Sequence, residues 1–149
     1  MLDVHILGDG PHRARMEHYC KEHKITRVTF HGWVTKDKMI AHYQSAHVQV
    51  ISSLFEGMSI AALEALSSGL FLICTKVSGM EDLIKDGING NFIPFKSPLE
   101  LSNAIKAYQK NMFSKDYQVP SEFLTHFRNE YSWPGIARQY LERIEQKLF

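Results

Sequence analysis

The chain has 149 residues, of which 44% are hydrophobic and 22% are charged, and its formal net charge is +1. This length fits a single domain over 1–149, which would bury about two-thirds of the surface of the unfolded chain. Because the basic residues are scattered rather than clustered, no strong positive field is expected and nucleic acid is excluded as a partner. No apolar run approaches the roughly 20 residues that a membrane-spanning helix needs.

Short apolar runs alternate with helical patterns along the chain. The predicted strands are Asp3–Leu7, Arg27–His31, Val48–Ile51, Leu70–Cys74 and Asn91–Ile93. Between them, apolar residues recur at helical spacing after Pro11, after a capping Thr35 and over Met58–Leu66. This alternation predicts an α/β fold, namely a Rossmann-like three-layer sandwich with a mainly parallel sheet.

The C-terminal third is predicted to be mostly helical. Ser97-Pro98-Leu99-Glu100 is a capping box with proline at the first helical position. The buried stripe of that helix is predicted to be Leu101, Ala104, Ile105 and Tyr108. The polar stretch Asn111–Pro120 is predicted to be a loop. A final helix follows Ser132-Trp133-Pro134, and it is expected to pack through Ile136, Tyr140, Leu141, Ile144 and Leu148.

Cysteine and histidine usage gives no sign of a disulfide or of a metal site. Cys20 and Cys74 are the only cysteines, and Cys74 falls in an apolar run, so we expect free thiols in a reducing cytoplasm. Neither His18 and His23 nor His42 and His47 share a helix face well, because each pair is five residues apart. An Asp-x-Asp that could hold a cation beside a diphosphate is also absent.

The segment Ser52–Leu66 carries the clearest chemistry. A strand ends at Ile51, and the loop after it holds Ser53, Glu56 and Gly57 before a helix begins near Met58. In an open parallel sheet, ligands bind beyond the carboxyl ends of the strands, where helix N-termini offer free N–H groups. We therefore expect a phosphate to bind the backbone of Met58, Ser59 and Ile60, with Gly57 allowing close approach.

Glu64 is the only charged residue of the predicted helix Met58–Leu66. Among small and apolar neighbours, such a helix is expected to be buried nearly all round, and a buried carboxylate needs partners. Paired hydroxyl groups of a ligand could supply them. The alternative is a glutamate that faces solvent on a thin polar edge of the helix.

Glu56 and Glu64 stand eight positions apart, which is an E-x7-E motif. Five further motif segments occur in order along the chain, namely Ile6–Pro11, Val28–Gly32, Ser53–Glu56, Ala65–Gly69 and Asp86–Gly90. Together these six motifs resemble the group 1 or family-4 retaining glycosyltransferases, which have the GT-B fold. The resemblance runs from about Val4 to the end of the chain and implies the C-terminal domain, which binds the nucleotide-sugar donor.

The resemblance also implies roles for single residues. Glu56 would be the catalytic contact to the transferred sugar, and Glu64 would bind the ribose. The backbone of 58–60 would hold the diphosphate, and the backbone around Trp33 and Val34 would meet the base. Such enzymes transfer sugar from a nucleotide sugar, such as a UDP- or GDP-sugar, to a glycan or lipid-linked acceptor. They need no metal or other cofactor.

The family's donor domain opens with another strand and helix, which carry a G-R…K-G motif that grips the diphosphate. Against that pattern, this chain begins at the second strand of the domain, and the acceptor-binding domain is absent. We therefore expect a fragment or one half of a split enzyme, with a separate N-terminal chain as its partner. Weak donor binding and no turnover are expected of the chain alone. The expected location is the cytoplasm. Contact with the inner face of the membrane is left open, because no basic amphipathic helix in the sequence indicates it.

The sequence leaves three other functions open. A dinucleotide-binding domain is suggested by Gly8-Asp9-Gly10, but Arg13 stands at the third glycine position and no acidic residue ends the next strand. A sugar-nucleotide epimerase of the same fold would use the same pocket. A non-catalytic, partner-binding subunit would use the free sheet edges on either side of the absent strand.

Overall fold

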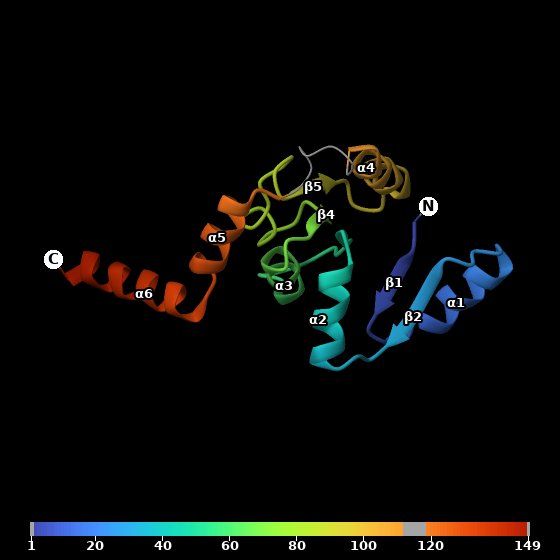
Figure 1. The fold of residues 1–149 in the computed structure, drawn as a ribbon, viewed down its shortest axis with the longest axis horizontal. Coiled ribbons are helices and arrows are strands. Elements are labelled where there is room, and N and C mark those ends of the chain that lie inside the picture. Colours follow the sequence, from blue (N-terminus) through green and yellow to red (C-terminus); the bar gives the residue numbers. More distant parts are fainter. Residues whose placement is uncertain (1, 112–118, 149) are drawn as a thin grey trace. The chain divides into compact units, whose positions relative to one another are not determined.

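The computed structural model describes residues 2–111 and 119–148, in which strands and helices follow one another along the chain (Figure 1). The strands are β1 (Val4–Leu7), β2 (Val28–Gly32), β3 (Val48–Ile51), β4 (Phe71–Thr75) and β5 (Gly90–Ile93). The helices are α1 (Arg13–Glu22), α2 (Lys36–Ser45), α3 (Ile60–Ser67), α4 (Pro98–Asn111), α5 (Ser121–Glu130) and α6 (Trp133–Leu148). Most of the predicted loop Asn111–Pro120 lies outside the described residues.

The chain divides into two units, Met1–His42 and Tyr43–Phe149. In the first unit β1 and β2 form a parallel two-stranded sheet, joined through α1. Val4, His5 and Ile6 pair with Val28, Thr29 and Phe30, and the register then shifts so that Leu7 pairs with Gly32. The shift leaves His31 as an extra residue in β2, which is the pattern of a β-bulge.

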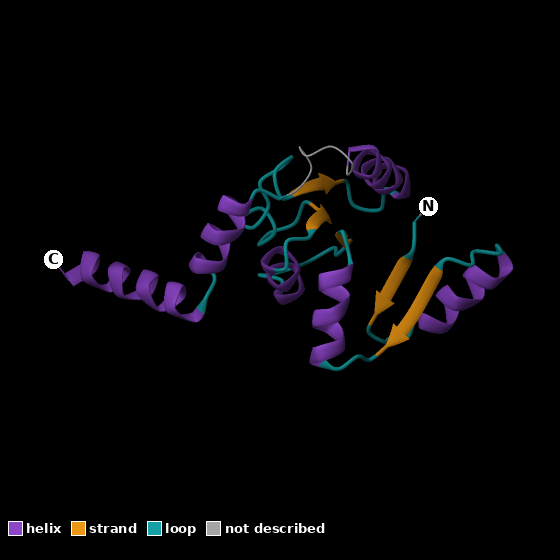
Figure 2. Ribbon diagram, viewed as in Figure 1, coloured by secondary structure: helices purple, strands orange, loops and turns teal. Residues whose placement is uncertain are grey.

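The second unit contains the three-stranded sheet β3-β4-β5, and both strand pairs are parallel. These strands are drawn in orange in Figure 2. All five residues of β4 are buried. Burial without alternation indicates that both faces of the sheet are covered, as is usual when helices connect parallel strands. The predicted α/β fold with parallel strands is therefore confirmed.

The core of the second unit forms where α4 packs on the sheet. Phe71, Ile73, Ile93 and Tyr108 make a buried cluster, and Leu101, Ala104 and Ile105 pack against it with Val48. The apolar stripe predicted for the helix at 98–111 is therefore confirmed. Burying these side chains supplies most of the stabilisation of this layer, because each large aliphatic or aromatic side chain contributes about 1.5–3 kcal/mol.

Two helices differ from the prediction. The sequence did not indicate α5, which buries Phe127 and ties its end to α3 through a hydrogen bond from Arg128 Nε to the Ser67 carbonyl oxygen, 2.7 Å long. The packing predicted for the last helix is wrong over most of its described length. Ile136 is half-buried, but Tyr140, Leu141 and Ile144 are exposed, and the side chain of Leu148 lies outside the described residues.

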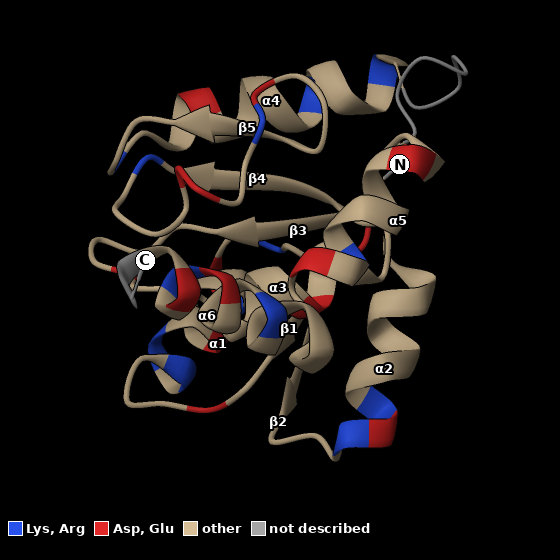
Figure 3. Ribbon diagram, turned by 90° about the vertical axis from the view of Figure 1, so that its left-hand side faces the viewer, with Lys and Arg blue, Asp and Glu red and all other residues tan. Residues whose placement is uncertain are grey.

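Charged residues of both signs are interspersed over the described helices, as the scattered basic residues of the sequence predicted (Figure 3). At the start of α2, for example, Lys36 and Lys38 flank Asp37. Among the described residues, no helix combines the length and the apolar content that crossing a membrane requires.

Candidate functional site

The loop after β3 leads into α3, which begins at Ile60 rather than at the predicted Met58. Ser59 is the N-cap, and its Oγ accepts a hydrogen bond from the Ala62 amide at 3.4 Å. The Ser59 carbonyl oxygen accepts from the Leu63 amide at 3.0 Å. The amides of Ile60 and Ala61 come before the first amide that donates within the helix, so they are the donors that the helix itself does not use.

A second loop, after β4, supports the first. Thr75 Oγ1 donates to the Ser53 carbonyl oxygen at 2.5 Å. Gly79 has a φ of +82°, and a Cβ on it would clash with the Gly57 carbonyl oxygen. The two loops are therefore in backbone contact at the carboxyl ends of neighbouring parallel strands, the edge where ligands bind in open α/β sheets.

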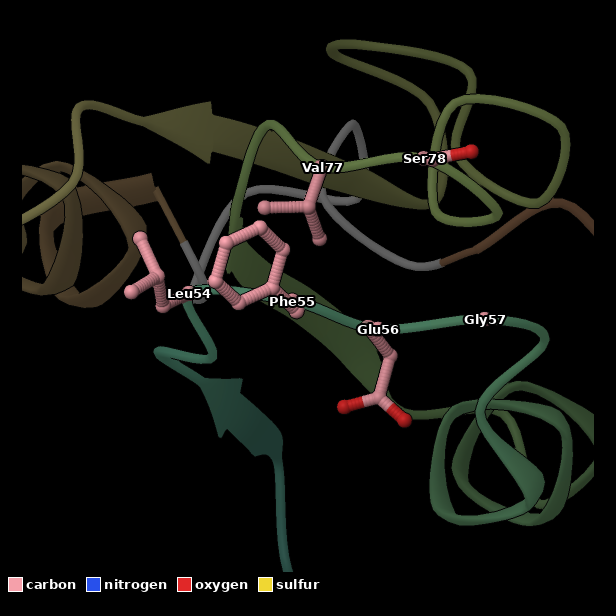
Figure 4. A pocket seen from close by; sticks show the side chains of 6 residues that line it. All are labelled: Leu54, Phe55, Glu56, Gly57, Val77 and Ser78. Atoms are coloured by element: carbon pink, nitrogen blue, oxygen red, sulfur yellow. The ribbon is translucent and has the colours of Figure 1, made fainter.

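An open pocket of about 630 Å³ lies between these loops, lined by Leu54, Phe55, Glu56, Gly57, Val77 and Ser78. Figure 4 shows the Phe55 ring beside Leu54 and Val77, while the Glu56 carboxylate points away from them. Phe55 is 85% exposed, and Glu56 is half-buried. The pocket thus joins an apolar wall to one carboxylate, next to the start of α3.

Glu64 lies one turn into α3, and its environment corrects the prediction. The helix buries only one face, through Ala62, Ala65 and Leu66, whereas Glu64 is exposed. The small neighbours were predicted to enclose the carboxylate, but they pack inward and leave it on the outer face. An exposed carboxylate remains solvated, so burial does not force a ligand upon it.

The Glu64 carboxylate is nevertheless held by a protein group. Tyr43 is buried, and its hydroxyl donates to Glu64 Oε2 at 3.2 Å. Burial, and secondarily the nearby Glu64 charge, raises the pKa of Tyr43 to about 12. The phenol therefore stays protonated and remains a donor at physiological pH. This contact orients the carboxylate and leaves its other oxygen available to a ligand.

The structure brings most of the predicted donor residues together in the second unit. The loop and the first turns of α3 contain Ser53, Glu56, Gly57, Met58, Ser59, Ile60 and Glu64. Trp33 and Val34 follow β2 in the first unit, where Trp33 is 86% exposed and Val34 is half-buried. Packing within its own unit therefore does not enclose the Trp33 side chain.

Sequence reasoning missed the groups that support this site. Tyr43, Thr75 and Gly79 act on it from other elements, at separations that no local pattern reveals. The sequence offered one signal for this neighbourhood, the order of the predicted parallel strands. Val77 and Ser78 follow one such strand and Glu56 follows its neighbour, so all three lie at the same edge of the sheet.

The segment Asp86–Gly90, one of the six motifs, has a structural role. Asn89 is fully buried, its Oδ1 accepts from the Lys85 amide at 2.7 Å, and its Nδ2 donates to the Leu83 carbonyl oxygen at 2.9 Å. Asp86 Oδ1 accepts from the Phe92 amide at 3.2 Å. These bonds fix the approach to β5.

Residues 2–122 match the protein family described as glycosyl transferases group 1. An uncharacterized glycosyltransferase of Methanocaldococcus jannaschii is 30% identical over 135 residues, which cover 90% of this chain and 34% of that protein. One of the subunits of the Arabidopsis thaliana phosphatidylinositol N-acetylglucosaminyltransferase is 28% identical over 135 residues, which cover 90% and 29%. The chain spans about a third of the length of these curated relatives.

A solved structure agrees with these matches. The Anabaena protein HepE in complex with UDP-glucose has a TM-score of 0.78 to this chain at 19% identity, covering 97% of this chain and 41% of that one. At this identity the likeness shows the fold. Together with the family match, it confirms the family that the sequence motifs predicted. The chain belongs to the group 1 glycosyltransferases and has the fold of the C-terminal domain of a GT-B enzyme.

Proposed function

We propose that this chain binds a nucleotide-diphosphate sugar and forms the donor-binding part of a retaining glycosyltransferase. The observation that carries the proposal is the meeting of three features at one sheet edge. They are the capped N-terminus of α3, the Glu56 pocket beside it, and the Glu64 carboxylate held by Tyr43. Each feature suits a different part of a nucleotide sugar.

The diphosphate would accept hydrogen bonds from the Ile60 and Ala61 amides at the start of α3. The partial positive charge of a helix N-terminus favours an anion there, and Gly57 keeps the approach free of a Cβ. Such donors also stabilise the negative charge that develops on a departing diphosphate. On this account, the donor site uses the protein's own dipoles and no metal ion.

The two carboxylates would contact the sugars at either end of the diphosphate. Glu64 would accept from the ribose hydroxyls, and Glu56 from hydroxyls of the transferred sugar near its anomeric carbon. Two hydroxyls per carboxylate give charge-assisted hydrogen bonds, which are about twice as strong as neutral ones.

The acceptor and the complete reaction are further proposals. The Arabidopsis relative is named for transfer of N-acetylglucosamine to phosphatidylinositol, and a relative in Salmonella typhimurium for transfer of galactose to lipopolysaccharide. By analogy, we propose a glycan or a lipid-linked acceptor and a cytoplasmic site at or near a membrane. The free thiols of Cys20 and Cys74 agree with a reducing compartment.

We further propose that the chain alone transfers no sugar and acts with other protein, either as one part of a longer enzyme or beside a separate N-terminal chain. The relatives are about three times as long, which supports this view. An epimerase that uses the same pocket is the second candidate. Analysis of the products would separate it from a transferase, because an epimerase releases an altered sugar without an acceptor.

The test is a calorimetric titration of the folded chain with UDP, GDP and ADP up to millimolar concentration. One of them should bind, and Glu64→Gln should weaken it about tenfold, the loss expected for a hydrogen bond to a charged group. Glu100→Gln, an exposed change in α4, is the matched control and should leave binding unchanged. If the folded chain binds none of the three, it does not hold the donor by itself.

A further inference from the structure

Three histidines from three elements of the first unit lie together. His5 is in β1, His31 in β2 and His42 in α2. His5 pairs with Thr29, and His31 is the extra residue at the register shift two positions further along β2. The contact between the two rings places both side chains on one face of the sheet. His42 reaches that face from α2.

The ring contacts are close. His5 Nδ1 and His31 Nε2 are 2.9 Å apart. The ring centroid of His31 lies 5.1 Å from that of His5 and 4.5 Å from that of His42, and the His5 and His42 centroids are 5.7 Å apart. One nitrogen from each ring can be chosen so that all three lie within 4.8 Å of one another.

We propose that His5, His31 and His42 form a binding site for a divalent transition metal ion of the zinc class. Zinc binds histidine nitrogens at about 2.0–2.1 Å, so two ligands of a tetrahedral ion are about 3.3 Å apart. The His5 and His31 nitrogens are 2.9 Å apart, and one nitrogen from each of the three rings lies within 4.8 Å of the others, so these distances lie on both sides of the tetrahedral value. Small rotations about the side-chain bonds would bring them to it. Three imidazoles without a carboxylate or thiolate favour zinc, copper or nickel over magnesium or calcium.

The environment suits a metal as well. His5 is exposed, whereas His31 and His42 are half-buried, so an ion has access from solvent and the fourth position of the site stays open to water.

A cluster of stacked rings without an ion is the competing explanation. Stacking and the hydrogen bond between the His5 and His31 rings account for one pair, whereas a nitrogen of His42 converges with theirs as well. The sequence did not reveal the site because its ligands are 26 and 11 residues apart and come from three different elements. The site lies in the first unit and shares no residue with the Glu56 and Glu64 region.

The experiment titrates the full, untagged chain with Zn²⁺ by calorimetry and with Co²⁺ by visible absorption. We expect one ion per chain with a micromolar or tighter Kd, and the intense visible bands of four-coordinate Co²⁺. His5→Gln, which changes an exposed side chain, should weaken Zn²⁺ at least tenfold. His18→Gln is the matched control on the exposed side of α1 and should change nothing. Glu64→Gln should also leave Zn²⁺ binding unchanged, which keeps this test separate from that of the donor site.

Histidine-selective NMR of the wild-type chain gives a second readout that needs no variant to fold. Zn²⁺ should shift the ring signals of His5, His31 and His42 first. The proposal is overturned if the folded chain binds no ion at 100 micromolar Zn²⁺. It is equally overturned if the ring signals of other histidines shift instead, or if His18→Gln weakens binding as much as His5→Gln does.

Discussion

At the scale of single residues, the account depends on how the Glu64 carboxylate is held. The carboxylate is exposed, so a free side chain would sample several rotamers and lose entropy when a ligand ordered it. The hydrogen bond from the buried Tyr43 hydroxyl restricts those rotamers before a ligand arrives. Tyr43 therefore acts as a positioning residue for Glu64.

We predict that Tyr43→Phe weakens binding of the nucleotide diphosphate about three- to tenfold, the effect of losing one hydrogen bond of about 1 kcal/mol. The aromatic ring stays, so the packing of α2 should change little. Calorimetry on both proteins measures the effect. Tyr108→Phe is the control, because it removes the hydroxyl of a buried tyrosine that donates to the His47 carbonyl oxygen and not to Glu64. Equal losses in the two variants would contradict a positioning role.

The raised pKa of Tyr43 makes stability depend on pH in one direction. The folded chain binds this proton more tightly than the unfolded chain, in which the pKa is near 10. The contribution is therefore complete below pH 10 and is lost as pH rises from 10 through about 12. Urea unfolding at pH 9, 10 and 11 should show a steeper loss of unfolding free energy for the wild-type chain than for Tyr43→Phe. If the unfolding free energies of the two proteins fell equally with pH, burial would not raise the pKa of this phenol.

At the scale of elements, the two loops after β3 and β4 form the site by touching each other. The contact is between backbone atoms of Gly57 and Gly79, so no side chain can replace it. The Thr75 hydroxyl adds a second link from β4 to the Ser53 carbonyl oxygen. Both links come from residues whose roles no local pattern in the sequence reveals.

Gly79→Ala should destabilise the second unit and weaken diphosphate binding. A left-handed backbone conformation costs a non-glycine residue about 1–2 kcal/mol, and the clash with the Gly57 carbonyl oxygen adds to that cost. Gly87→Ala is the matched control, because Gly87 also has a positive φ, of +77°, but nothing within 4 Å of its Cβ position. Thermal unfolding should show the larger loss for Gly79→Ala. An equal loss for both would mean that the loops do not depend on this contact.

The elements also show where the sequence was informative. Strands β3 and β4 and helix α4 were predictable because continuous apolar runs and a capping box with a buried stripe are strong local signals. Helix α5 was missed even though it carries apolar residues at 123, 124 and 127, since it lies beyond the polar stretch Asn111–Pro120. The exposure of Glu64 was not predictable, because it depends on which face of α3 meets the sheet.

At the scale of the whole molecule, the strands form two separate parallel sheets, β1-β2 and β3-β4-β5. The order of motifs along the chain predicted the family and the α/β fold. It did not reveal side chains that meet across long separations, such as Tyr43 with Glu64 or the three histidines of the first unit. Those meetings depend on register and helix orientation, which one sequence without its fold does not show.

The central claim is that a diphosphate binds at the N-terminus of α3. The most direct measurement is an amide ¹H–¹⁵N NMR titration of the folded chain with the nucleotide diphosphate that calorimetry selects, and with inorganic pyrophosphate for comparison. We predict that the Ser59, Ile60 and Ala61 amides shift first and most with both ligands, and that signals near Glu64 shift only with the nucleotide. Binding that leaves these three amides unmoved, or that shifts a different surface, would contradict the account.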